Sequence, residues 1–196
     1  MRDSAVISLV VGLANLGFYM FIDPLLRKDA TAKSKEPTEH DKGTTRFIGA
    51  VFAVSWLLLL LTALLNQFGI GIVEPHLVFT AIGVVLVATG VALRVVAMRT
   101  LGKFFTRTLQ MREEHHVVSD GIYRRVRHPG YLGDIALFVG SGIATGNVIT
   151  TLLILAVILP AFVRRIAAEE RMLTDLLGKE YLAYRTTTWK LIPFVF

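Results

Sequence analysis

The length of the hydrophobic runs constrains this chain more than any other feature. Five segments are almost entirely apolar, at about residues 4–26, 45–68, 76–98, 131–145 and 148–163. A helix needs about 20 apolar residues to cross the hydrocarbon core of a bilayer. The last two segments are shorter and are separated by Gly146-Asn147, which indicates a turn. We therefore expect an all-α, polytopic membrane helix bundle with about five transmembrane helices, the fourth and fifth forming a hairpin.

The composition agrees with a membrane setting. Hydrophobic residues make up 54% of the chain and charged residues only 18%, against about 25% charged in soluble domains. The 196 residues leave room for a single membrane domain, in which 1–98 hold three helices and 99–196 hold the polar motifs. Cysteine is absent, which excludes disulfides and thiolate metal ligands.

Basic residues alternate between the connecting segments. Six Lys or Arg lie in 27–46 and seven in 99–127, whereas 66–75 and the turn at Gly146 contain none. Because basic loops are retained in the cytoplasm, we expect an external amino terminus and a cytoplasmic carboxyl terminus. The net charge of +6 then indicates contact with anionic membrane lipids and not with nucleic acid.

Polar groups concentrate between the third and fourth hydrophobic runs. Residues 115–123 read HHVVSDGIY and residues 127–131 read RHPGY, so imidazoles, phenols and guanidiniums gather at a membrane boundary. Pro129 restricts His128 to extended geometry, which would fix the loop where it enters the fourth helix. We interpret this cluster as a functional site.

A second polar motif, RRIAAEER at 164–171, lies where the fifth helix leaves the membrane. Arg165 and Glu169 are four residues apart and share a helical face. The alternative interpretation is that Arg164 and Arg165 only reach the headgroups while the glutamates are solvated. Two observations weigh against it: Arg before Glu is the less stabilising order, and a carboxylate pair beside anionic headgroups needs a cationic partner.

Two other acidic sites receive plainer interpretations. Glu113 and Glu114 precede His115 and His116, but adjacent histidines do not share a helical face and no second ligand pair follows, so we expect no metal. Asp134 lies in the first turn of the fourth helix, and we expect it to satisfy backbone amides and the helix dipole.

Taken together, these motifs resemble the isoprenylcysteine carboxyl methyltransferase family. The resemblance covers about residues 102–194 and includes 115–123, RHPGY at 127–131, Arg165-x-x-x-Glu169-Glu170, and GKEYLAY at 178–184 leading to LIPF at 191–194. The first three helices match only in being hydrophobic. RHPxY is shared with membrane phospholipid methyltransferases, but the combination of motifs is specific.

The resemblance implies methylation by S-adenosyl-L-methionine, with S-adenosyl-L-homocysteine as product, of a carboxylate on a lipophilic, isoprenylcysteine-like substrate at the cytoplasmic membrane face. It makes 99–196 the catalytic half, with the cytoplasmic loop and a carboxyl-terminal helix enclosing the cofactor. It assigns the carboxylate-orienting and catalytic role to Arg165. The cofactor-binding residues that it implies are His115, His116, Val117, Val118, Tyr123, His128, Pro129, Gly130, Tyr131 and Glu169.

Two other classes of function stay open. A phospholipid or amine N-methyltransferase would share the cofactor motif but would have less use for Arg165, because a cationic side chain repels a partly protonated amine. A non-enzymatic membrane protein, such as a transporter subunit, would want polar groups at mid-membrane, and here the helix centres are nearly uncharged. Arg94 is the nearest exception, close to the cytoplasmic end of the third helix.

Overall fold

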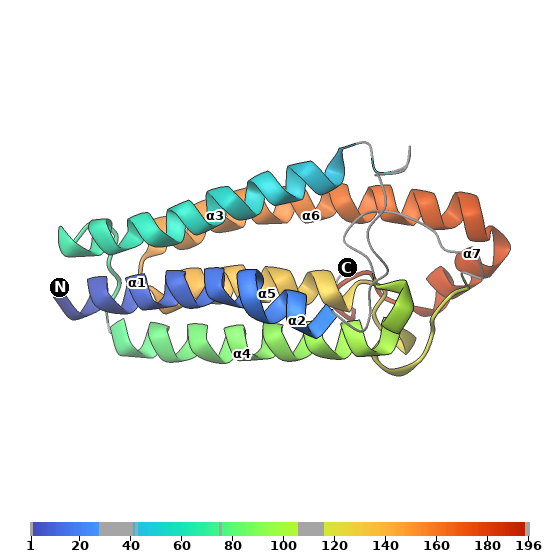
Figure 1. The fold of residues 1–196 in the computed structure, drawn as a ribbon, viewed down its shortest axis with the longest axis horizontal. Coiled ribbons are helices and arrows are strands. Elements are labelled where there is room, and N and C mark those ends of the chain that lie inside the picture. The colour runs from blue at the N-terminus through green and yellow to red at the C-terminus, as the bar shows by residue number, and fades with distance from the viewer. Residues whose placement is uncertain (1, 28–40, 42, 75, 106–115, 195–196) are drawn as a thin grey trace.

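The fold is a bundle of long helices (Figure 1). The computed structural model describes residues 2–27, 41, 43–74, 76–105 and 116–194. Its α-helices are α1 Arg2–Gly17, α2 Asp23–Arg27, α3 Thr44–Gln67, α4 His76–Leu101, α5 Pro129–Ala144, α6 Val148–Leu177 and α7 Lys179–Thr187. A π-helical turn, η1 Phe18–Ile22, joins α1 to α2, and two short 3-10 turns are η2 Gly102–Phe104 and η3 Gly121–Arg124. The long helices run side by side, and α7 lies at one end of the bundle.

Among the described residues, four helical stretches are long and apolar enough to cross a membrane: Asp3–Leu26, Thr44–Gln67, His76–Leu101 and Val148–Leu177. The helix α5 has 16 residues, fewer than the roughly 20 that a full span requires. The polytopic helical fold is confirmed, whereas a fifth full span stays a prediction.

The predicted hairpin is confirmed at α5 and α6. The helix α5 begins at Pro129, where the missing N–H of proline and its restricted φ suit a first helical position. Gly146 turns the chain with a φ of 62°, and the Asn147 side chain caps α6 by accepting from the Thr150 amide at 3.1 Å. The helix α6 continues past the apolar run that ends at Val163, so the 164–171 motif is helical as expected, and the helix ends only at Leu177.

Glycines bring α4 and α5 into close contact. A β-carbon added at Gly90 would lie 2.7 Å from the carbonyl oxygen of Gly133, and one added at Gly133 would lie 2.8 Å from that of Gly90. Gly83 and Gly140 form an equivalent pair two turns away. Small residues at matching positions allow helix backbones to approach in lipid. This contact places Arg94 of α4 beside Asp134 of α5.

An aromatic cluster fills the middle of the bundle between α1, α3 and α5. Tyr19 stacks on Phe138 with ring centroids 5.4 Å apart, and Phe52 packs on Phe138 at 4.7 Å. Trp56 donates to the Asn15 side chain at 2.9 Å, so its N–H is satisfied inside the bundle. Helices from both halves of the chain therefore share one core.

Candidate active site: two adjoining cavities

The first cavity lies where the end of α4, the 116–128 segment, α6 and α7 meet. The predicted residues that line it are His116, Val117, Val118, Tyr123, His128, Gly130, Tyr131 and Glu169. Pro129 is buried at the start of α5 without lining the cavity, and His115 lies outside the described residues. Segments far apart in sequence thus converge on one space.

The second cavity lies deeper, between η1, α3, α5 and α6. Its walls are mainly apolar and aromatic, including Phe52, Trp56 and Phe162, and its charged lining residues are Arg94, Asp134 and Arg165. Arg165 therefore belongs to a different cavity from Glu169, although the two residues are one turn apart on α6. Three residues, Arg94, Phe105 and Tyr131, line both cavities and form their shared boundary.

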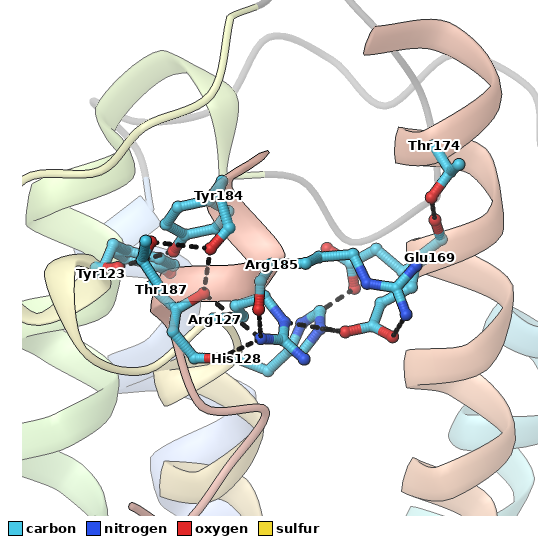
Figure 2. A network of polar contacts seen from close by, with 10 residues as sticks. Tyr123, Arg127, His128, Glu169, Thr174, Tyr184, Arg185 and Thr187 are labelled. Atoms are coloured by element: carbon cyan, nitrogen blue, oxygen red, sulfur yellow. Dashed lines mark hydrogen bonds and ion pairs between the residues drawn. The ribbon is translucent and has the colours of Figure 1, made fainter. Parts of the chain in front are cut away.

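Glu170, next to Glu169, is buried in a clamp that joins three segments (Figure 2). Arg127 donates through Nε to Glu170 Oε1 at 2.9 Å and through NH1 to the Arg185 carbonyl at 3.2 Å. The same NH1 also donates to the carbonyl of Thr188. The clamp holds α6, the 127–131 motif and the end of α7 together, which fixes the orientation of the cavity wall.

His128 lies between the two glutamates of α6. Its Nδ1 is 3.8 Å from Glu169 Oε2 and its Nε2 is 3.5 Å from Glu170 Oε1. Its ring stacks on Tyr131 with centroids 5.6 Å apart and planes 13° from parallel. The RHPGY motif therefore contributes one residue to the clamp and two stacked rings to the cavity.

Within the described part of the chain, three buried polar side-chain atoms have no hydrogen-bond partner: His128 Nε2, Glu169 Oε2 and Tyr181 OH. All three residues line the first cavity. His128 Nε2 faces Glu170 Oε1 at 3.5 Å. Because buried polar atoms are rarely left unsatisfied in proteins, Glu169 Oε2 and Tyr181 OH leave unused hydrogen-bonding capacity in residues of this cavity wall.

Tyrosines of α7 close the cavity from the side opposite α4. Tyr184 donates its hydroxyl to the Tyr123 carbonyl at 2.6 Å (Figure 2). Burial raises the pKa of Tyr184 to about 12, so this phenol stays protonated and keeps donating at neutral pH. Burial also raises the pKa of Tyr181 well above its usual value, and the charges of Glu170 and Glu169 add to the effect.

Arg165 is 3% exposed and is held from two sides. Its Nε donates to the Tyr131 hydroxyl at 3.2 Å. Its NH1 lies 2.7 Å from Asp41 Oδ1, 2.7 Å from Thr44 Oγ1 and 2.9 Å from Thr45 Oγ1. The alternative of an arginine that only reaches for headgroups is therefore wrong for Arg165.

Arg94 is the centre of a buried ionic cluster at the boundary of the two cavities. Its Nε donates to Asp23 Oδ1 at 2.7 Å, and its NH1 lies 2.6 Å from Asp134 Oδ1. Tyr19 donates to the same Asp134 oxygen at 2.6 Å. The expectation that Asp134 serves the helix dipole is wrong, because close α4–α5 packing supplies a guanidinium for it.

Sequence reasoning missed several residues of the first cavity. They are Arg94, Leu101, Phe104, Phe105, Arg127, Met172, Leu173, Leu177, Tyr181 and Tyr184. Met172 and Leu173 follow Glu169 by three and four positions, so helical periodicity alone would have placed them on its face. Tyr181 and Tyr184 share one face of α7 by the same rule.

In the described part of the chain, no three His, Asp or Glu side chains lie close enough together to hold a metal ion.

Comparisons with known proteins agree with this architecture. Residues 81–175 match the model of the isoprenylcysteine carboxyl methyltransferase family. Protein-S-isoprenylcysteine O-methyltransferase A of Arabidopsis thaliana is 31% identical over 146 residues, which are 74% of this chain and 74% of that protein. The Saccharomyces cerevisiae protein-S-isoprenylcysteine O-methyltransferase is 31% identical over 118 residues, 59% of this chain and 49% of that protein.

The fold also matches a solved structure, that of a eukaryotic intramembrane Ras methyltransferase described as an isoprenylcysteine carboxyl methyltransferase. The TM-score is 0.62 at 22% sequence identity, covering 98% of this chain and 71% of the other. The likeness supports an integral membrane fold. Because it is 31% identical to the Arabidopsis protein over 74% of that protein's length, the chain belongs to the isoprenylcysteine carboxyl methyltransferase family.

Proposed function

We propose that this protein transfers a methyl group from S-adenosylmethionine to the carboxylate of a lipophilic, isoprenylcysteine-like substrate. The observation that carries the proposal is the pair of adjoining cavities. One has unsatisfied polar atoms, the other has apolar walls and a buried arginine, and they meet at Arg94, Phe105 and Tyr131. A polar donor and a lipid-like acceptor can therefore reach a common boundary from different sides.

The first cavity has the chemistry that S-adenosylmethionine requires. Glu169 Oε2 would accept from its amino or hydroxyl groups, and Tyr181 OH is a second polar atom without a hydrogen-bond partner among the described residues. Met172, Leu173 and Leu177 provide an apolar wall for the adenine ring. When bound, S-adenosylmethionine supplies a methyl group on a sulfonium. Of the ten residues proposed to bind it, Pro129 acts through the backbone by starting α5, and His115 lies outside the described residues.

The second cavity suits the acceptor. Its aromatic walls would hold an isoprenoid chain, and Arg165 would hold a carboxylate. A guanidinium offers N–H donors in a rigid plane and does not lose its proton. The Tyr131 hydroxyl receives the Nε donor of Arg165 at 3.2 Å, which restrains the guanidinium plane.

The reaction requires positioning more than acid–base chemistry. A carboxyl group with a pKa near 4 is already ionised at neutral pH. A carboxylate oxygen attacks the methyl carbon as the carbon–sulfur bond breaks, and the bonding electrons go to sulfur. One positive and one negative charge disappear, and no proton moves. Correct positioning of two reactants can supply about 7–11 kcal/mol of the barrier reduction.

The experiment is a methyl-transfer assay with purified protein in lipid nanodiscs. The donor is S-adenosylmethionine with a radiolabelled methyl group, and the acceptors are N-acetyl-S-farnesyl-cysteine and phosphatidylethanolamine. We expect label only on the carboxylate acceptor, in a form that mild base releases as methanol, because the product is an ester. Base-stable label on phosphatidylethanolamine would instead establish the amine methyltransferase alternative.

Arg165→Lys tests the role of the guanidinium. We expect the variant to bind S-adenosylhomocysteine nearly as well as the wild type but to lose most turnover, at least about tenfold, because an ammonium lacks the rigid planar array of donors that orients the carboxylate. Binding and turnover are measured on the same preparation, since a misfolded variant would lose both. Near-normal turnover would remove Arg165 from the reaction, and loss of cofactor affinity alone would place it in the first cavity.

A further inference from the structure

A carboxylate of the chain itself already occupies one edge of the Arg165 guanidinium. Asp41 Oδ1 lies 2.7 Å from Arg165 NH1, and the Asp41 side chain is 1% exposed. The two residues are 124 positions apart. No step of the proposed reaction uses Asp41, so the function of this buried ion pair needs its own explanation.

The first turn of α3 holds the Asp41 carboxylate in place. Gly43 takes a left-handed φ of 76°, which turns the chain so that Asp41 faces the helix start. The Asp41 carbonyl accepts from the Thr44 amide at 2.7 Å, and Asp41 Oδ1 accepts from the hydroxyls of Thr44 at 3.0 Å and Thr45 at 2.7 Å. Arg165 NH1 donates to the same two hydroxyl oxygens. The carboxylate is thus fixed by the helix and cannot rotate freely away from Arg165.

Asp41 carries a negative charge at neutral pH. Burial acts to raise its pKa, but hydrogen bonds from Thr45 and Thr44 and the charge of Arg165 together lower the pKa below its usual value. Thr45, in the same cluster, lines the second cavity beside Arg165. A substrate carboxylate at Arg165 would therefore share its guanidinium with a fixed like charge.

Two charges near Arg165 are lost during the proposed reaction. The charges of Arg165 and Asp41 cancel, whereas the bound carboxylate contributes −1, the sulfonium of the methyl donor contributes +1, and methyl transfer removes both. The Arg94, Asp23 and Asp134 cluster has the same charges before and after transfer. In the proposed arrangement the carboxylate contacts Arg165, next to Asp41, and the sulfonium lies beyond it in the first cavity. Asp41 therefore repels the carboxylate more strongly than it attracts the sulfonium, and it disfavours this charged state relative to the transition state, in which both charges are partly lost. Weaker binding of the ground state than of the transition state is what raises a rate constant.

We propose that Asp41 is a positioning residue that half-neutralises Arg165, so that the guanidinium orients the substrate carboxylate without holding it too tightly to react. This inference rests on the proposed carboxyl methyltransferase function. It makes Asp41 a determinant of how the site distinguishes a carboxylate from its methyl ester.

Asp41→Asn removes the charge and keeps a side-chain oxygen that can accept from the Thr44 and Thr45 hydroxyls, as Asp41 Oδ1 does. We expect the dissociation constant of N-acetyl-S-farnesyl-cysteine to fall by about tenfold, from loss of one like charge at short range. The dissociation constant of its methyl ester should stay the same, because an uncharged ligand feels no repulsion. We expect kcat at saturating substrate to fall by about threefold, since the half-charged transition state gains only part of what the ground state gains.

Both dissociation constants are measured with S-adenosylhomocysteine bound, and kcat is measured in the same nanodiscs. Asp175→Asn is the matched control, because it removes an exposed carboxylate of α6 that lines neither cavity. This control should change neither kcat nor the ratio of the dissociation constants of the carboxylate and its methyl ester. If Asp41→Asn does not fold, Asp41→Ser offers a second neutral residue for the same comparison.

Other outcomes overturn the proposal. Equal weakening of acid and ester binding would mean that Asp41 only supports the α3 terminus. If Asp41→Asn leaves the ratio of the two dissociation constants unchanged, or leaves kcat unchanged, the charge of Asp41 does not influence the reaction. Wild-type protein that methylates no carboxylate would instead refute the proposed function, so the two failures are distinguishable.

Discussion

Glu169 and Glu170 are adjacent residues of the same type with opposite surroundings. The side chain of Glu170 is buried. Its Oε1 accepts from Arg127 Nε at 2.9 Å, and its Oε2 lies 3.9 Å from Arg185 NH2. Glu169 lines the first cavity, and its Oε2 has no hydrogen-bond partner among the described residues. One position along a helix rotates a side chain by about 100°, which is enough to separate a structural carboxylate from one available to a ligand.

Glu169→Ala tests the ligand role. We expect the binding free energy of S-adenosylhomocysteine to weaken by about 1.5–3 kcal/mol, the range for a hydrogen bond to a charged group. Isothermal titration calorimetry measures the change, with Asp175→Asn as the control from the same helix. An affinity equal to that of the wild type would remove Glu169 from the cofactor site.

At the level of elements, the contact between α4 and α5 positions the boundary of the two cavities. Gly90 and Gly133 let the backbones approach, and the residues near them in sequence, Arg94 and Asp134, form an ion pair at 2.6 Å. The Arg94 side chain then lines both cavities. The glycine contact between α4 and α5 thus determines where the buried charge of Arg94 lies.

Gly90→Ala should destabilise the protein even though alanine favours helices. The added β-carbon would lie 2.7 Å from the Gly133 carbonyl, and overpacking of this kind typically costs about 1–3 kcal/mol. We expect a lower Tm in detergent, followed by tryptophan fluorescence.

The matched control is Gly17→Ala in α1, where a β-carbon would meet no atom within 4 Å. We expect that variant to keep or slightly raise the Tm, because Ala in place of Gly inside a helix stabilises by about 0.5–1 kcal/mol. Equal Tm shifts for the two variants would show that the α4–α5 approach is looser than described here.

At the scale of the whole molecule, the candidate site lies at one end of the bundle. The turn between α5 and α6 and the end of α3 lie at the opposite end, and α7 lies beside the site (Figure 1). Basic residues are dense in the segments on the site's side and absent from 66–75. We therefore propose that the site faces the cytoplasm.

The absence of cysteine makes this orientation testable. Single cysteines replace Gln67 at the end of α3 and Thr187 at the end of α7, and intact cells are treated with a membrane-impermeant maleimide. We expect labelling at 67 in intact cells and at 187 only after permeabilisation. The reverse pattern would place the site on the external face.

The sequence by itself determined the helical membrane fold, the α5–α6 turn and eight of the eighteen residues that line the first cavity. These features depend on local properties: apolar runs, the turn residues Gly146 and Asn147, and polar motifs whose resemblance to a family could be read directly. The far end of α6 was not predicted, because the charged residues after Val163 end the apolar run without ending the helix, which continues to Leu177.

Only the tertiary structure decided which distant charges meet. Asp41 reaches Arg165 across 124 positions and Arg94 reaches Asp23 across 71. Neither pair has a local signal, because their contacts depend on how closely α3 packs on α6 and how η1 and α2 place Asp23 against α4. A buried charge requires a partner, but this rule does not say which residue the partner is. That depends on how the helices pack.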